Sequence, residues 1–447
     1  MQNLRNIPKI DKFIQSKEFE NLNGSLILKL SKTVINQKRE RILSGNDTLI
    51  DEKELVQQVL KRYYETVSCG TKPLINATGV IVHTNLGRSP IDKEIFNRAK
   101  ELVCGYSNLE YNLLTALRGE RYEEINRLFK ILFDIEDVLV VNNNAAAVFL
   151  ILNTFAKEKE VVVSRGELVE IGGSFRIPEV MRESGAILRE VGTTNKTNIG
   201  DYENAINEKS SILMKVHKSN FTIEGFSQSV EFKDIHSLAQ KNGLIDYFDL
   251  GSGHIGNLPY NLSHNEPEIE KILKEKPSLI SFSGDKLFGS VQAGIIFGKK
   301  ELIAKLKKNQ LLRMLRVDKV TLALLEESVK AYIMEDYDKI TTKRLLHTET
   351  KELRARAENM ASKIGDNVCE VIDTFTYVGG GTMPNKKIPS IALKFSLSPT
   401  FLERAFRECL VIGRVENEAF LLDFRSIDKD EDEKLLEIIR RVLRCFE

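Results

Sequence analysis

Short apolar runs that alternate with helical segments occupy the middle of this 447-residue chain and constrain its fold more than any other feature. Each run is rich in β-branched or other apolar residues. The runs are Val138–Val141, Glu160–Val163, Ile212–Val216, Leu244–Asp249, Leu279–Phe282 and Gly294–Phe297. Strands that alternate with helices in this way form a mainly parallel sheet with helices on both faces. The pattern predicts a large α/β domain over residues 74–320.

The first part of the chain, residues 1–70, has a different pattern. Behind the acidic pair Asp51 and Glu52, apolar residues recur at helical spacing, namely Leu55, Val56, Val59, Leu60, Tyr63 and Tyr64. Residues 69–73, Cys-Gly-Thr-Lys-Pro, form a linker-like stretch. We therefore expect a separate helical N-terminal domain.

The last part, residues 321–447, mixes both element types. A helical stretch near 320–334 is followed by strand-like runs at Ser390–Phe395 and Ala419–Asp423. A closing helix is predicted behind the mostly acidic run 428–433. Its apolar residues fall on one face, namely Leu435, Leu436, Ile439, Val442, Leu443 and Phe446. The sequence predicts a smaller α+β C-terminal domain.

A basic cluster lies in the N-terminal segment: Lys29, Lys32, Lys38, Arg39 and Arg41, opposed only by Glu40. The cluster fits either a solvated helix face or a contact with an RNA backbone. Because the net charge of the whole chain is +1, a nucleic acid would have to meet such a local patch.

The chain carries no signal for a membrane or a metal site. Its start lacks an apolar signal region, and its most apolar window, Val138–Phe155, is interrupted by Asn142, Asn143 and Asn144. The five cysteines lie far apart with no C-x-x-C pair, which favours reduced thiols over disulfides or zinc. We expect a cytoplasmic protein without a bound metal.

Lys286 lies on a short turn, Ser283–Leu287, directly after an apolar strand. Burial at such a position depresses the pKa of the amine and makes it a nucleophile toward an aldehyde. The alternatives are a surface turn lysine and the S-x-x-K motif of penicillin-binding enzymes, whose further S-D-N and K-T-G elements are absent. Ser283 would bind the cofactor phosphate in a pyridoxal enzyme.

Asp249 ends another buried strand. A carboxylate there keeps the pyridine nitrogen of pyridoxal phosphate protonated, so that the ring accepts electrons. An Asp in a glycine-rich turn is the alternative. The glycines 251, 253 and 256 also match the dinucleotide fingerprint, but Asn257-Leu258-Pro259 stands where that motif needs a helix.

A phosphate cradle is predicted where the strand Val138–Val141 runs through Asn142 to Ala147 into an apolar helix. The amides and the dipole at the helix N-terminus bind phosphate, so Asn143, Asn144 and Ala145 are candidate cofactor contacts. His217 ends a neighbouring strand, so its ring is a candidate cofactor contact. A strand-end histidine bonded to backbone is the alternative.

Several arginines lie near turn glycines or three residues apart and could face an anion. They are Arg88, Arg118, Arg121, Arg313 and Arg316. On a helix, Arg313 and Arg316 would share a face. An ordinary solvated basic face is the alternative.

Together these segments resemble the bacterial selenocysteine synthases, the L-seryl-tRNA(Sec) selenium transferases, over nearly the whole chain. The resemblance lies in 75–79, 83–88, 142–147, 215–217, 249–253, 281–286, 292–294 and 315–319. It implies a pyridoxal-phosphate-dependent transferase of fold type I, similar to aspartate aminotransferase. Lys286 would hold the cofactor as a Schiff base, and Asp285 would join it as a catalytic residue.

The resemblance also implies the reaction. The serine of seryl-tRNA(Sec) would form an external aldimine and lose its α-proton and hydroxyl to give aminoacrylyl-tRNA, which selenophosphate converts to selenocysteinyl-tRNA. Arg88, Arg121, Arg313 and Arg316 would bind selenophosphate. The N-terminal domain would bind tRNA, and the assembly would be a homodecamer, a ring of dimers with active sites at the dimer interfaces.

Two departures from the family pattern stand out. Gly289-Ser290-Val291 replaces an expected Gly-Gly-Pro, and Glu120 replaces a small residue, which puts the roles of Arg118 and Arg121 in doubt. The alternatives are a related pyridoxal lyase acting on a free amino acid or amino-sugar acid, and a tRNA-binding assembly factor with a dead site.

Overall fold

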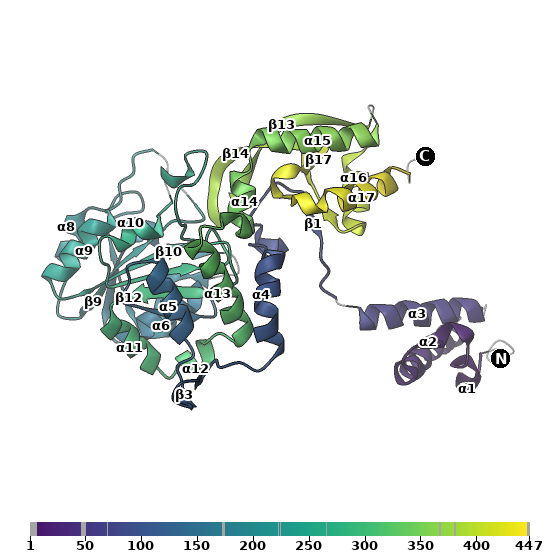
Figure 1. Ribbon diagram of the computed structural model, residues 1–447, viewed down its shortest axis with the longest axis horizontal. Coiled ribbons are helices and arrows are strands. Elements are labelled where there is room, and N and C mark those ends of the chain that lie inside the picture. Colours follow the sequence, from purple (N-terminus) through teal and green to yellow (C-terminus); the bar gives the residue numbers. More distant parts are fainter. Residues whose placement is uncertain are drawn as a thin grey trace. The chain divides into compact units, whose positions relative to one another are not determined.

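The computed structural model describes residues 7–45, 51–68, 70–171, 175–221, 223, 225–264, 266–365, 368–379 and 381–444. The chain divides into two compact units, residues 1–74 and residues 75–447 (Figure 1). The larger unit contains more than one hydrophobic cluster. The division of that unit into domains 74–320 and 321–447 stays a prediction.

The first unit is helical. Its helices are α1 (Ile10–Phe13), α2 (Gly24–Leu43) and α3 (Glu52–Val67). Asn23 caps α2 by accepting from the Leu26 amide, and Asp51 caps α3 by accepting from that of Lys53. The buried faces meet in a small core that includes Phe13, Ile27, Val34, Leu55 and Val59.

A seven-stranded sheet is the centre of the second unit. Its order is β4 (Asp137–Val141), β12 (Gly294–Gly298), β11 (Leu279–Ser283), β10 (Ile245–Gly251), β9 (Ser210–Val216), β5 (Glu160–Ser164) and β8 (Ile187–Val191). All neighbours pair in parallel except β12, which is antiparallel to β4 and to β11. The mainly parallel sheet predicted from the sequence is therefore confirmed.

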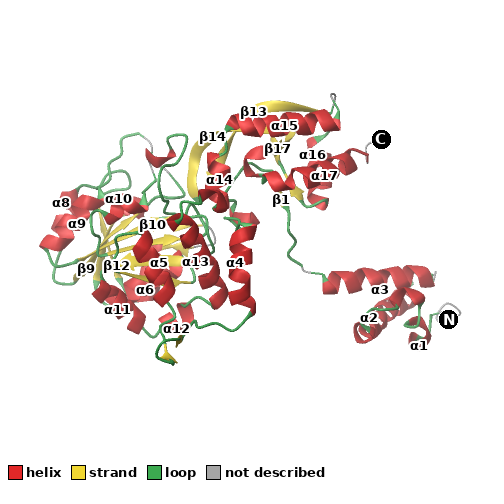
Figure 2. Cartoon of the chain, viewed as in Figure 1, coloured by secondary structure: helices red, strands yellow, loops and turns green. Residues whose placement is uncertain are grey.

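Helices cover both faces of this sheet, which explains the continuous apolar runs (Figure 2). Val161 and Val163 of β5 belong to the large cluster that includes α6 (Asn144–Phe155) and α7 (Ile177–Ser184). Val162 belongs to a second cluster with α8 (Ile199–Ala205) and α9 (Phe232–Lys241).

A smaller antiparallel sheet follows, in the order β13 (Cys369–Gly379), β14 (Thr382–Phe395), β17 (Ala419–Asp423) and β16 (Arg414–Glu416). It packs with α15 (Thr350–Ile364), α16 (Pro399–Glu408) and α17 (Asp432–Arg444). The predicted apolar face of α17 is found, although Phe446 lies outside the described residues. The helix expected near 320–334 is α13 (Lys319–Ile333).

A short strand at the start of the second unit, β1 (Ile75–Asn76), pairs with β15 (Val411–Ile412). Within the described ranges, no helix is long and apolar enough to cross a membrane. The same ranges contain no group of three His, Cys, Asp or Glu side chains that could hold a metal ion. Cys104, Cys369 and Cys409 carry free thiols, and Cys69 and Cys445 are not among the described residues.

Candidate active site

Three predicted site residues follow three neighbouring strands. Lys286 follows β11, Asp249 lies near the end of β10, and His217 follows β9. Because these strands are parallel and adjacent, their carboxyl ends lie at one edge of the sheet. This edge is where ligands bind in open α/β sheets.

The amine of Lys286 is buried. Lys286 is 8% exposed, and burial lowers its pKa, although the Asp249 and Asp285 carboxylates oppose that shift. Its carbonyl accepts a hydrogen bond from the Ser89 hydroxyl at 2.7 Å. The turn closes at Gly289, whose φ is +74° and where a Cβ would lie 2.5 Å from Ile340 Cγ2. Lys286 is therefore not a surface turn lysine.

Asp249 is a buried carboxylate held by two donors. Asn144 Nδ2 donates to Asp249 Oδ1 at 2.7 Å, and the Gly251 amide donates to the same oxygen at 3.0 Å. Burial raises the pKa of Asp249, while these two hydrogen bonds and the charges of Lys286 and His217 act in the opposite direction. The two hydrogen bonds thus fix the orientation of the carboxylate.

The predicted strand, turn and helix N-terminus are found at β4 and α6. Asn143 caps α6 by accepting from the Ala146 amide at 2.9 Å. The amides of Asn144 and Ala145 belong to the first turn, where helix amides have no intrahelical acceptor. Gly294 of β12 packs against this turn, since a Cβ there would lie 2.1 Å from the Asn143 carbonyl oxygen.

Arg88 lies beside the lysine turn. Its φ is +64°, and its Nη1 lies 2.8 Å from Asp285 Oδ2. Asp285 is 6% exposed, whereas the Arg88 side chain is 35% exposed. A buried carboxylate thus orients a guanidinium that solvent can still reach.

A second group of arginines surrounds Glu110, a residue that the sequence did not single out. Arg121 Nε donates to Glu110 Oε1 at 2.9 Å, and Arg316 Nη1 lies 3.8 Å from the same oxygen. The hydrogen bond from Arg121 lowers the pKa of Glu110 and burial raises it, and the pKa is lowered overall. Arg118 also bonds to Glu110 but is 79% exposed.

Arg313 and Arg316 have different surroundings. The helix α12 (Leu312–Leu315) ends before Arg316, which is extended and bridges Val141 of β4. Arg313 is exposed. The expectation of one shared helix face is therefore wrong, because the helix stops one residue too early.

His217 contacts both backbone and a side chain. Its amide donates to the Asp249 carbonyl at 2.9 Å, and its Nε2 lies 3.1 Å from Glu266 Oε2. Glu266 was not expected from the sequence, since it lies in an irregular segment after β10.

A glycine at the tip of the β13–β14 hairpin lies over the lysine. A Cβ built at Gly381 would lie 3.8 Å from Lys286 Cε and 3.9 Å from its Nζ. The smaller sheet therefore contributes to the surroundings of Lys286. No sequence pattern predicts this contact.

These residues fit pyridoxal phosphate. A buried amine, a buried carboxylate on the neighbouring strand and a helix N-terminus match the aldehyde, pyridine nitrogen and phosphate of that cofactor. Ser283 lies at the end of β11 and is buried. Asn144 Oδ1 is buried without a hydrogen-bond partner, so it can accept from a bound group.

The departure at Ser290 is accommodated locally. Ser290 is fully buried, and its hydroxyl donates to Ser328 Oγ of α13 at 2.7 Å. The Ser328 hydroxyl in turn donates to the Leu324 carbonyl at 2.9 Å. Glu120, the other departure, is exposed.

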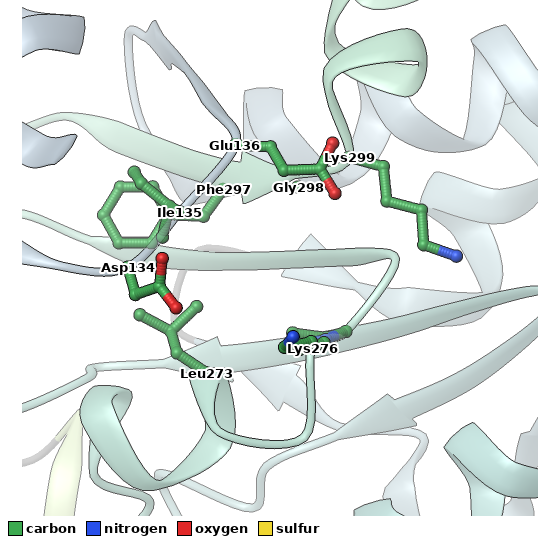
Figure 3. A pocket seen from close by; sticks show the side chains of 9 residues that line it. Asp134, Ile135, Glu136, Leu273, Lys276, Phe297, Gly298 and Lys299 are labelled. Carbon is green, nitrogen blue, oxygen red and sulfur yellow. The ribbon is translucent and has the colours of Figure 1, made fainter.

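Two pockets lie away from Lys286 and Asp249. One, of about 180 Å³, lies before β4 and β11, at the opposite edge of the sheet (Figure 3). Residues such as Asp134, Lys276 and Lys299 line it, and no predicted site residue does. The other, of about 400 Å³, is bordered by Arg121 and by Glu326 of α13.

Comparisons with known proteins agree with this geometry. The family described as "SelA: L-seryl-tRNA selenium transferase" matches residues 74–428. The chain is 57% identical over 446 residues to an L-seryl-tRNA(Sec) selenium transferase of Aliarcobacter butzleri, covering 99% of each chain. It is 53% identical over 442 residues to that of Campylobacter concisus, covering 98% of this chain and 99% of the relative.

The fold is also found in a solved structure. D-glucosaminate-6-phosphate ammonia-lyase superposes with a TM-score of 0.60 at 19% identity, covering 86% of this chain and 98% of the lyase. At this identity the likeness concerns the fold alone. It agrees with the expected fold type I.

Proposed function

The chain belongs to the L-seryl-tRNA selenium transferase family, and we propose that it converts L-seryl-tRNA(Sec) into L-selenocysteinyl-tRNA(Sec) with selenophosphate as the selenium donor. Its cofactor is pyridoxal phosphate. The observation that carries the proposal is the buried Lys286 amine beside the buried Asp249 carboxylate, at the ends of neighbouring strands.

Four groups of this chain would hold the cofactor. Lys286 would bind its aldehyde carbon, and the first-turn amides of α6 with the Ser283 hydroxyl would bind its phosphate. Asp249 would keep a proton on the pyridine nitrogen, and His217 lies next to Asp249. Bound pyridoxal phosphate supplies an electron sink for the carbon that carries the serine amine.

Lys286 has a second role in the proposal. When the serine amine takes its place on the cofactor, the free Nζ can accept the α-proton of serine. The lowered pKa of Lys286 keeps more of this amine neutral near pH 7 than in an ordinary lysine. The same proton can then reach the leaving hydroxyl.

The arginines would bind the donor anion. Serine esterified to tRNA has no free carboxylate, so no arginine is needed to hold one. Arg88, Arg121, Arg313 and Arg316 therefore remain available for selenophosphate. Asp285 would orient Arg88 through their 2.8 Å ion pair.

The helical first unit would bind tRNA. Of the basic cluster, Lys29, Lys32, Arg39 and Arg41 are exposed, whereas Lys38 is buried. Lys29, Lys32 and Arg39 fall within an arc of about 80° on α2. One helix face thus presents three cations to a phosphate backbone.

We also propose the assembly implied by the family resemblance, a homodecamer built as a ring of dimers in the cytoplasm. Exposed apolar side chains around the β2–β3 hairpin (Tyr111–Asn112 and Leu117–Arg118) support an interface there. They are Tyr106, Tyr111, Leu113, Leu114 and Leu117. Light scattering on the purified protein tests the ring size.

Selenium transfer itself is the decisive experiment. Purified protein with pyridoxal phosphate is incubated with seryl-tRNA(Sec) and ⁷⁵Se-labelled selenophosphate, and labelled aminoacyl-tRNA is the expected product. A lyase acting on a free amino acid or an amino-sugar acid would instead release ammonia from such a substrate. Absence of label on the tRNA, with cofactor bound and serine-charged tRNA intact, refutes the proposal.

A further inference from the structure

Glu266 and His217 form a buried pair at the carboxyl edge of the large sheet. His217 Nε2 lies 3.1 Å from Glu266 Oε2, and the two side chains are 16% and 1% exposed. Ser252, which is fully buried, donates its hydroxyl to the other oxygen, Oε1. Both oxygens of the carboxylate are therefore engaged.

The segment that carries Glu266 is itself anchored. His254 Nε2 lies 3.2 Å from the Glu266 carbonyl, and the Ile269 amide donates to the His254 carbonyl at 3.0 Å. His254 is 1% exposed. Ser252 thus holds the carboxylate of Glu266 and His254 holds its backbone, and both residues come shortly after Asp249 in the chain.

The pair lies beside the cofactor residues. The His217 amide donates to the Asp249 carbonyl, and the His217 charge acts on Asp249. The charged groups that act on Lys286 are Asp249, Asp285, Arg88 and Glu266. Among these groups, Glu266 is the one to which neither the family resemblance nor the sequence pattern assigns a role.

We propose that Glu266 is a positioning residue for the reaction, which acts through His217. It accepts the Nε2 proton of His217 and fixes the ring next to Asp249. Orienting a site residue through a buried hydrogen-bonded carboxylate is a common way to preorganise a site. The inference rests on the proposed function only for the identity of the cofactor.

The test uses the visible absorbance band of the full-length protein loaded with pyridoxal phosphate, titrated with pH. Glu266→Gln keeps the size of the side chain and removes its charge. In the proposal the carboxylate acts by holding the His217 ring, so its removal should move the pH midpoint of the band by about 0.5–1 unit. Ser252→Ala removes one hydrogen bond to Glu266 and should give a smaller shift in the same direction.

A double-mutant cycle separates positioning from a direct effect. In the His217→Gln background, Glu266→Gln should cause a much smaller shift than in the wild type, because most of its effect passes through the ring. A full shift that persists without His217 overturns the proposal. The readout needs neither tRNA nor selenium, so it can fail or succeed independently of the selenium-transfer assay.

The chain offers a matched control at the other end of β10. Asp246 is a fully buried carboxylate whose Oδ2 lies 3.0 Å from His236 Nδ1. Asp246→Asn should lower thermal stability without moving the absorbance midpoint. If Glu266→Gln behaves in the same way, with lower stability and an unchanged midpoint, Glu266 is only structural and the proposal is wrong.

Discussion

Asn144 Nδ2 donates a 2.7 Å hydrogen bond to Asp249 Oδ1, and this bond joins the first turn of α6 to the end of β10. The proposed phosphate and pyridine contacts are therefore linked by one side chain. Asn144 Oδ1, the other end of the same amide, is buried without a partner.

Asn144→Ala should lower kcat about 10- to 100-fold, because a hydrogen bond to a charged group contributes about 1.5–3 kcal/mol. Steady-state selenium transfer measures the change. Asn153→Ala is the control, since it lies on the same helix and removes a 3.1 Å bond to the Ser184 carbonyl far from the site. Equal effects of both substitutions would contradict a specific role of Asn144.

Lys286→Ala should abolish the visible cofactor band and lower activity by about 10³-fold or more, because both cofactor attachment and proton transfer lose their amine. Absorbance and the labelled-selenium assay measure the two losses. Lys299→Ala, in the pocket at the opposite sheet edge, should leave both unchanged. A variant without Lys286 that keeps the band would rule out this lysine as the attachment point.

Arg316→Ala should raise the KM for selenophosphate by about 10-fold or more, through the loss of charge-assisted hydrogen bonds. Arg118→Ala should change it little, although Arg118 also bonds to Glu110, because its side chain is 79% exposed. Initial rates at varied selenophosphate and saturating seryl-tRNA(Sec) measure both constants. The opposite ranking would remove Arg316 from the anion site.

Replacing Lys29, Lys32 and Arg39 together by Ala should weaken tRNA binding and reduce its salt dependence. Fewer counterions are released, so the slope of log K against log salt should fall by up to about 2–3. Filter binding at several salt concentrations measures this slope. Replacing three exposed lysines of α11 (Lys300–Lys308), namely Lys300, Lys305 and Lys308, changes the net charge equally and should have little effect.

Glu326 should make stability depend on pH. Burial and the nearby Glu124 raise the pKa of Glu326 to about 7. Since the folded state holds this proton more tightly than the unfolded state, stability should fall as pH rises from about 4.5 to about 7. Glu326→Gln should therefore raise the free energy of unfolding at pH 8 by about 1–2 kcal/mol, a value reduced for partial solvent access.

Denaturant unfolding at pH 5 and pH 8 measures this effect. The variant should gain stability over the wild type at pH 8 and little at pH 5. The exposed Glu301→Gln on α11 should give the same difference from wild type at both pH values. A Glu326→Gln protein that is no more stable than the wild type at pH 8 would contradict a raised pKa of Glu326.

The sequence predicted the strands that are buried on both faces, since burial requires a continuous apolar run. It missed β8, an edge strand that carries the polar pair Arg189 and Glu190 and has no such run. Strand ends also located Lys286 and Asp249, because parallel strands bring their carboxyl ends to one edge.

The remaining contacts could not be read from local pattern. Glu110 meets Arg316, and Glu266 meets His217, across long separations in the chain. Such pairings depend on how loops fold back on the sheet, and no residue spacing encodes them. The sequence spacing also did not show that α12 ends before Arg316. Because it does, Arg313 and Arg316 do not share a helix face.

Because residue 381 is a glycine, the space next to the Lys286 amine stays open for a large substrate. An alanine there would already touch Lys286, and any larger residue would fill the space above its amine. Serine attached to the end of a tRNA is a large substrate, and its α-carbon must come close to this amine. The glycine at this hairpin tip of the smaller sheet thus leaves free a space beside the amine that even one methyl group would reduce.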